Sequence, residues 1–215
     1  MLARHPSHPN LVVLDHPLIE HKLSHLRDVE TSSRAFRALL DQIAGLMVYE
    51  VTRTLPYEDV PVRTPLEVTR GKRIVGEITV CPVLRAGLGM MSGVLNMMPE
   101  ARLGHIGLAR DERTLEPVTY LSKLPRDLSA GPVILVDPML ATGGSAAAAI
   151  DLLRQAGARD LRMICLVAAP EGVRRLEKAD AQVTIYTAAL DRGINEQGFI
   201  MPGLGDAGDR LFGTQ

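Results

Sequence analysis

The sequence predicts an α/β fold in which a mostly parallel sheet is flanked by helices. Three observations favour it. Short apolar runs alternate with helical segments from residue 78 onward, which is typical of a parallel sheet covered on both faces. Hydrophobic residues make up 46% of the 215 residues, enough for one core without metals or disulfides. One apolar strand ends in an acid and a glycine-rich turn, and ligands bind at such strand ends.

The first third of the chain predicts two helices and a β-rich stretch. Residues 1–16 suggest a tail with a short strand at 11–14, and a helix follows Pro17. Apolar residues then recur at helical spacing until Pro56 ends the second helix. The β-rich stretch covers residues 60–82. Candidate N-caps of the second helix are Thr31, Ser32 and Ser33.

The remainder alternates between strands and helices. Residues 110–126 are polar and charged, and they predict a protruding β-hairpin arm. Residues 193–215 are rich in glycine and predict irregular backbone, which is usually functional at such length. The expected strands are 78–83, 104–108, 133–136, 161–168 and 183–186, and the expected helices are 87–98, 146–155 and 171–178.

Composition excludes several classes of function. Lysine and arginine total 24 against 25 acids, so the net charge of −1 offers no general field for a nucleic acid. The chain has three Phe, four Tyr and no Trp, which leaves few surfaces for base stacking. Neither an apolar signal core nor an apolar run of about 20 residues occurs. We therefore expect a cytoplasmic protein that binds neither nucleic acid nor membrane.

The segment from 133 to 145 carries the clearest chemistry. An apolar strand ends at Asp137, and Thr142, two glycines and Ser145 precede an alanine-rich helix. Free N–H groups at a helix N-terminus attract anions, and the hydroxyls add donors, so the turn suits a phosphate group. An ordinary strand–turn–helix with an N-cap is the alternative. A Walker loop is excluded because no Gly-Lys-[Ser/Thr] follows.

This segment resembles the phosphoribosyl-pyrophosphate (PRPP) motif of type I phosphoribosyltransferases. That motif usually has two adjacent acids, and here Pro138 takes the second position. The form Asp-Pro-Met-Leu-Ala-Thr-Gly-Gly-Ser is similar to the uracil phosphoribosyltransferase branch. Further stretches in the same order resemble that branch, at residues 16–18, 21–23, 82–90, 114–118, 168–172 and 202–209.

The resemblance implies a Rossmann-like fold and a set of PRPP contacts. Arg85 is expected to bind the pyrophosphate, which suits the bidentate geometry of a guanidinium, and Arg110 is expected to make a second contact with PRPP. The arm at 110–126 is expected to be mobile and to bring Arg110 to the ligand. The 5′-phosphate and ribose are assigned to Asp137, Pro138, Met139, Leu140, Ala141, Thr142, Gly143, Gly144 and Ser145.

The glycine-rich end of the chain, residues 193–215, is expected to bind uracil. The resemblance assigns uracil contacts to Ile200, Gly205, Asp206 and Ala207, and Asp206 also faces PRPP. Small residues let the backbone approach a base closely, and a fixed N–H aimed at the uracil 4-oxygen would reject cytosine. Asp206, Arg85 and Arg110 are the expected catalytic residues.

The implied reaction joins uracil to PRPP and gives UMP and diphosphate. Mg²⁺ is the expected cofactor, held through PRPP and water without direct protein ligands. The resemblance also suggests a single domain over 1–215 with an N-terminal extension at 1–30, a homo-oligomer, and GTP as an activator. The alternatives are a phosphoribosyltransferase for another base and an RNA-binding regulator of pyrimidine operons on the same fold.

Two other patterns carry little weight. Residues 203–208 match the dinucleotide fingerprint GxGxxG, but only seven residues follow, so no βαβ unit can form around it. His21 and His25 are four apart, yet no carboxylate context supports a metal site there.

Cys81 and Cys165 lie in apolar runs and predict buried side chains.

Overall fold

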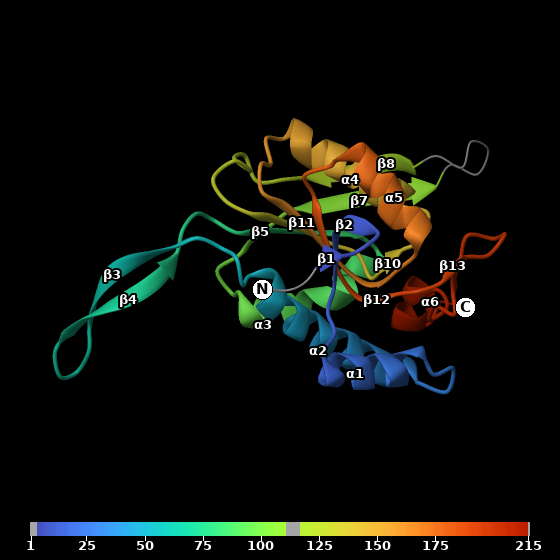
Figure 1. The fold of residues 1–215 in the computed structure, drawn as a ribbon, viewed down its shortest axis with the longest axis horizontal. Helices are drawn as coiled ribbons and strands as arrows, with labels where there is room; N and C mark the ends of the chain where they lie inside the picture. The colour runs from blue at the N-terminus through green and yellow to red at the C-terminus, as the bar shows by residue number, and fades with distance from the viewer. Residues whose placement is uncertain (1–3, 111–116, 215) are drawn as a thin grey trace.

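The computed structural model describes residues 4–110 and 117–214, and a long twisted sheet forms its centre (Figure 1). The strands of this sheet run in the order β1-β2-β12-β11-β9-β5-β7-β8. Their bounds are β1 Arg4–His5, β2 His8–Val13, β5 Thr79–Leu84, β7 His105–Arg110, β8 Pro117–Lys123, β9 Val133–Val136, β11 Leu161–Ala168 and β12 Thr184–Leu190. Two short strands join from the side: β6 (Arg102–Leu103) pairs with β5, and β10 (Met139–Leu140) pairs with β11.

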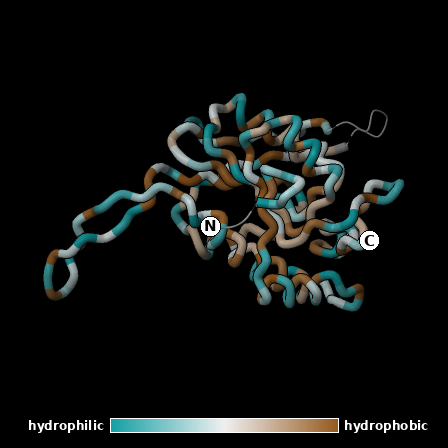
Figure 2. Tube along the Cα trace, viewed as in Figure 1, coloured by the Kyte–Doolittle hydropathy of each residue, from teal (hydrophilic) through white to brown (hydrophobic). Residues whose placement is uncertain are grey.

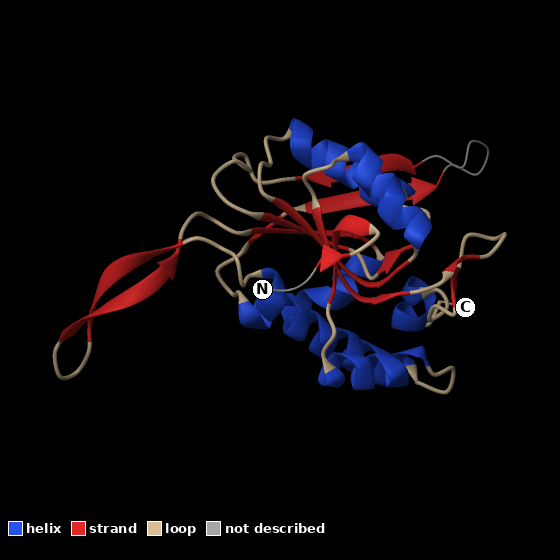
Figure 3. Cartoon of the chain, in the orientation of Figure 1, coloured by secondary structure: helices blue, strands red, loops and turns tan. Residues whose placement is uncertain are grey.

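The pairing confirms the predicted mostly parallel sheet. Strands β2, β12, β11, β9, β5 and β7 pair in parallel, whereas the edge strands β1 and β8 pair antiparallel with β2 and β7. Helices cover both faces (Figure 3). They are α1 Pro17–Arg27, α2 Ser33–Val51, α3 Met91–Met97, α4 Gly144–Gln155, α5 Pro170–Ala179 and α6 Ala207–Phe212, with the 3₁₀ helix η1 at Ala86–Met90.

Alternating side chains divide the core into two hydrophobic clusters. On β9, Ile134 and Val136 belong to the cluster under α1, α2 and α3, while Val133 and Leu135 belong to the cluster under α4 and α5. All four side chains are fully buried. A strand with helices on both faces must be apolar throughout, which explains the unbroken run 133–136.

A second hairpin, which the sequence predicted only as a β-rich stretch, projects from the body (Figure 1). Strands β3 (Tyr57–Arg63) and β4 (Val68–Ile74) pair only with each other and extend away from the sheet (Figure 1). Figure 2 shows hydrophobic segments along this hairpin. The sequence predicted only that the region is β-rich. Alternating polar and apolar residues indicate a strand, but they do not identify its pairing partner.

The region 110–126, predicted to protrude, instead lies partly in the main sheet. Strand β8 pairs with β7 from His105↔Lys123 to Arg110↔Pro117, so the predicted hairpin forms but serves as an edge of the sheet. Residues 111–116, which include most of the motif at 114–118 and the first part of the expected mobile arm, lie outside the described residues.

Other elements differ from the prediction in detail. The expected helix 87–98 begins as η1 and continues as α3, and the expected helix 31–55 spans only Ser33–Val51. The tail, predicted to be irregular, contains a short pair, β13 (Gly193–Ile194) with β14 (Ile200–Met201), and ends with α6. Among the described residues, each helix is too short or too polar to cross a membrane.

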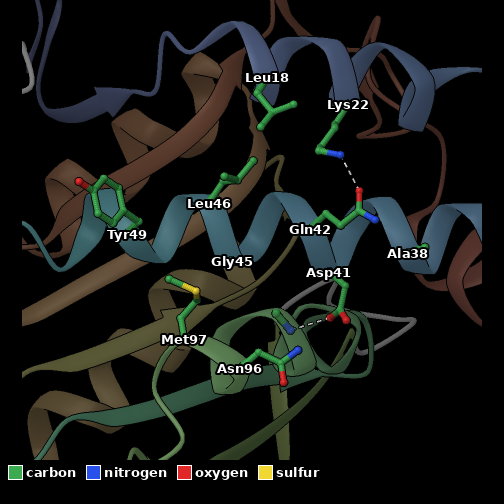
Figure 4. Close-up of a pocket in the computed structure, with 11 residues that line it drawn as sticks. Leu18, Lys22, Ala38, Asp41, Gln42, Gly45, Leu46, Tyr49, Asn96 and Met97 are labelled. Carbon is green, nitrogen blue, oxygen red and sulfur yellow. Dashed lines mark hydrogen bonds between the residues drawn. The ribbon is translucent and has the colours of Figure 1, made fainter.

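Helices α2 and α3 approach each other closely at Gly93. The Asp41 carboxylate Oδ1 on α2 accepts a hydrogen bond from Gly93 N at 2.7 Å, and Figure 4 draws this bond. A Cβ at residue 93 would clash with the main-chain oxygen of Asp41 and would lie 3.1 Å from Gly45 N. Main-chain atoms of a helix cannot yield as a side-chain end can, so glycine is required there.

We predict that Gly93→Ala lowers the free energy of unfolding by about 2 kcal/mol, because α2 and α3 must separate. Urea denaturation followed by circular dichroism measures it. The matched control is Ser92→Ala on the same helix, whose exposed side chain predicts a change within about 0.5 kcal/mol. Equal effects of the two substitutions would contradict the close approach.

Candidate functional site

Several predicted site residues follow parallel strands at the same edge of the sheet. Arg85 follows β5 and Asp137 follows β9, and Asp191, which was not among the predicted residues, follows β12. Because these strands are parallel, their carboxyl ends meet along one edge, where open α/β sheets bind ligands. The topology therefore brings together segments that are far apart in the sequence.

The turn from Asp137 to Leu140 is held against β11 by main-chain hydrogen bonds. Leu166 N donates to Pro138 O at 2.9 Å, and Ala169 N donates to Leu140 O at 2.8 Å. The Asp137 carboxylate accepts a hydrogen bond from Met139 N at 3.3 Å. Burial raises the pKa of Asp137 to about 7.

The second half of the turn starts helix α4. Gly143 has φ +75°, and a Cβ there would lie 2.9 Å from Gly172 O on α5. A Cβ on Gly172 would in turn lie 2.6 Å from Ala141 O, so the turn and α5 touch through their backbones. Thr142 is half-buried and Ser145 is exposed, which leaves their hydroxyls at the N-terminus of α4. This arrangement presents N–H groups, hydroxyls and the positive helix end to an anion.

Two arginines were predicted beside this turn. Arg85 is exposed, and its guanidinium carbon lies 5.8 Å from the centre of the Phe212 ring of α6. The segment after it packs on the end of β9, since a Cβ on Gly87 would lie 2.5 Å from Val136 O. Arg110 is the last residue of β7, which pairs with β5, so its backbone reaches the same edge.

The C-terminal tail, from residue 193 onward, lies against the turn at 137–145, which was predicted to bind phosphate. A Cβ on Gly198 would come within 3.7 Å of the Thr142 methyl carbon. Gly205 has φ +77°, in the left-handed region that favours glycine, and the exposed Asp206 caps α6 by accepting a hydrogen bond from Asp209 N at 2.9 Å. Ile200 and Ala207 are buried. The predicted uracil contacts therefore share one short loop.

Sequence reasoning missed residues that support this edge through long-range contacts. Arg27 pairs with Asp191, Arg210 ties the tail to the end of α1, and Phe212 meets Arg85. Arg175 of α5 has a guanidinium nitrogen 3.4 Å from a Cβ built on Gly144. No local spacing marks these residues, because each of the contacts named here joins two residues that lie between 31 and 182 positions apart.

Comparisons with known proteins point to one family. The family model described as "Uracil phosphoribosyltransferase" matches residues 13–214. A protein named uracil phosphoribosyltransferase from Streptococcus pneumoniae is 56% identical over 204 residues, which cover 94% of this chain and 98% of that protein.

Two solved structures show the same fold. The AQ2163 protein from Aquifex aeolicus superposes with a TM-score of 0.91 at 37% identity, covering 95% of this chain and 99% of that one. An adenine phosphoribosyltransferase from Leishmania donovani is only 12% identical but has a TM-score of 0.61, with 91% and 90% of the chains covered. That second similarity concerns the fold alone. With a family model that spans nearly the whole sequence, the chain belongs to the uracil phosphoribosyltransferase family.

Proposed function

We propose that this protein converts uracil and PRPP to UMP and diphosphate. One observation carries the proposal besides family membership: the glycine-rich tail lies against the turn that opens helix α4, with Thr142 and Gly198 adjacent. A phosphate site and a small-molecule loop at one sheet edge are what joining a base to a ribose phosphate requires. An RNA-binding regulator would need a basic face, and the balanced charge gives it no support.

The turn after β9 is the proposed site for the ribose 5-phosphate. The N–H groups and hydroxyls at the start of α4 would hold the phosphate, because they are fixed by the backbone contact with Gly172. Asp137 would accept hydrogen bonds from the ribose hydroxyls. Such bonds favour the ionised carboxylate and offset the burial that raises its pKa. The residues of this site are Asp137, Pro138, Met139, Leu140, Ala141, Thr142, Gly143, Gly144 and Ser145.

The pyrophosphate would lie between Arg85 and Arg110, at the ends of neighbouring strands β5 and β7. The C–O bond to pyrophosphate breaks as the uracil nitrogen attacks the anomeric carbon, so positive charge develops on the ribose and negative charge on the leaving group. Two guanidinium groups stabilise that negative charge. The protein therefore acts chiefly by positioning and electrostatics.

Uracil would be recognised by the backbone of the loop that contains Ile200, Gly205 and Ala207. Gly205 leaves room for a base to approach the main chain, so the loop can recognise the base without a bulky side chain. A main-chain N–H that faces the 4-oxygen of uracil would face an amino group in cytosine and lose its partner. Asp206, at the end of this loop, would face both uracil and PRPP.

Mg²⁺ is the proposed cofactor, and the donor set suits it. The hard oxygen atoms that Mg²⁺ prefers would come from PRPP itself and from water, without direct protein ligands. Residues 4–110 and 117–214 contain no group of three or more His, Cys, Asp and Glu arranged to hold a metal. When bound, the ion would neutralise part of the pyrophosphate charge. We assign Asp206 a contact through water. GTP activation stays a prediction of the resemblance.

We also propose that a second copy of the chain covers the groove between α1, α2 and α3. This groove has a volume of about 680 Å³, and Leu18, Leu46 and Met97 face it together (Figure 4). The β3–β4 hairpin ends in an exposed apolar tip, with Leu66 95% exposed and Val68 68% exposed. A lone two-stranded hairpin is marginally stable in water, so both surfaces favour a homo-oligomer.

The proposed reaction predicts that the protein, with PRPP and Mg²⁺, converts labelled uracil to UMP. Cytosine, adenine and hypoxanthine should react at least about 100-fold more slowly, because their edges leave loop donors or acceptors unpaired. Chromatography of the labelled nucleotides measures this. Faster conversion of another base would overturn the assignment of uracil.

Asp206→Asn is predicted to lower kcat by about 100-fold, since it removes the charge near the reacting groups. Asparagine caps helices as well as aspartate does, so the melting temperature should change little. Asp151→Asn, an exposed residue of α4, serves as the control with unchanged kcat. Wild-type turnover in Asp206→Asn would remove Asp206 from the catalytic residues.

The second-copy proposal predicts a lower assembly state when Leu46 and Met97 are both changed to glutamate, because two charges would be buried at the contact. Analytical ultracentrifugation at micromolar concentration measures the mass. Replacing the exposed Glu20 of α1 by glutamine is the control and should leave the mass unchanged. A monomeric wild-type protein would contradict the proposal.

A further inference from the structure

An ion pair joins the end of helix α1 to the segment that follows strand β12. The Asp191 carboxylate accepts hydrogen bonds from Arg27 Nη2 at 2.7 Å and from Arg27 Nη1 at 2.8 Å. The Asp191 side chain is 7% exposed and that of Arg27 is 22% exposed. A bidentate pair with so little exposure is held in one geometry, unlike the flexible pairs of a protein surface.

The same pair holds the backbone of the tail at Gly203. Asp191 Oδ2 accepts a hydrogen bond from Gly203 N at 2.8 Å, and Arg27 Nη1 donates to Gly203 O at 2.6 Å. Both polar main-chain groups of one residue are thus bound by the pair. Gly203 is buried, has φ +64°, and would clash with Ile200 O if it carried a Cβ. The pair therefore fixes the turn between Ile200 and Gly205.

A second arginine holds the next residue from the other side. Arg210 Nη1 donates to Leu204 O at 2.9 Å, and its Nη2 donates to Asp28 O at 2.5 Å. Its guanidinium carbon lies 4.6 Å from the centre of the Phe36 ring. Burial lowers the pKa of Arg210 from its ordinary value. The Gly203–Leu204 segment is thereby anchored to α1 and α2 as well as to the sheet.

We propose that Arg27 and Asp191 are positioning residues for base recognition. They act through Gly203, two residues before Gly205, because their side-chain hydrogen bonds run to each other and to the main chain of Gly203. The inference rests on the proposed uracil specificity of this loop. No local motif marks this pair. Its proposed role is to fix the position at which the main-chain donors and acceptors of residues 200–207 meet the base.

The chain offers a matched control pair at the opposite edge of the sheet. Arg154 Nε and Asp180 Oδ2 lie 2.5 Å apart, with side chains 23% and 11% exposed. Asp180 precedes β12, whereas Asp191 follows it, so the two pairs lie at opposite ends of one strand. Asp180→Asn should disturb stability much as Asp191→Asn does, without any contact with the tail.

The test compares steady-state constants for both substrates. Asp191→Asn replaces one acceptor oxygen by an NH₂ group, which cannot accept a hydrogen bond from Arg27 or Gly203. The KM for uracil should therefore rise about tenfold, with the KM for PRPP changed less than about twofold. Arg27→Lys keeps the charge but loses the bidentate geometry, and it should give a smaller rise in the same constant. Asp180→Asn should leave the ratio of the two KM values unchanged.

Three results would overturn the inference. The first is an equal change in both KM values for Asp191→Asn, the second is the same selective change in Asp180→Asn, and the third is a wild-type KM for uracil in both Arg27→Lys and Asp191→Asn. Thermal melting identifies any variant that fails to fold, in which case Arg27→Lys carries the test. Failure of the proposed function is separate, because wild-type protein would then form no UMP from uracil.

Discussion

The parallel register of β5, β9, β11 and β12 is the constraint on which the rest of the structure depends. It ends four strands at one edge. Segments with separate proposed chemical parts follow β5, β9 and β12, while β11 supports the turn after β9. The turn after β9 can then be fixed by hydrogen bonds to β11 on one side and by α5 on the other. Without that parallel arrangement, the Arg85 guanidinium, the turn at 137–145 and the loop at 200–207 would not lie at the same edge of the sheet.

The core of this fold could be predicted because its strands are buried on both faces. The strands at 133–136 and 161–168 were placed with their observed bounds, since a run of apolar residues between turn signals has few other solutions. The projecting β3–β4 hairpin was missed for the opposite reason. Its exposed strands carry mixed side chains, and nothing in that pattern says whether a hairpin joins the sheet or leaves it.

The candidate site divides in the same way. The turn at 137–145 is contiguous, so its glycines and hydroxyls could be recognised from the sequence. The supporting residues could not, because Arg27 and Asp191 meet across 164 positions and Arg85 meets Phe212 only in space. Local patterns describe groups that bind a ligand well, but they do not describe the packing that orients those groups.

The contact between Arg27 and Gly203 also bears on how the protein is made. The chain leaves the ribosome from its N-terminus, and α1 is among the first elements to emerge. Its partner in the tail lies 176 positions later. The strands of the sheet and the turn at 137–145 precede the tail in the sequence. Of the segments in the proposed site, the loop at 200–207 is therefore the last to be synthesised, so the residues proposed to bind the ribose phosphate exist before those proposed to choose the base.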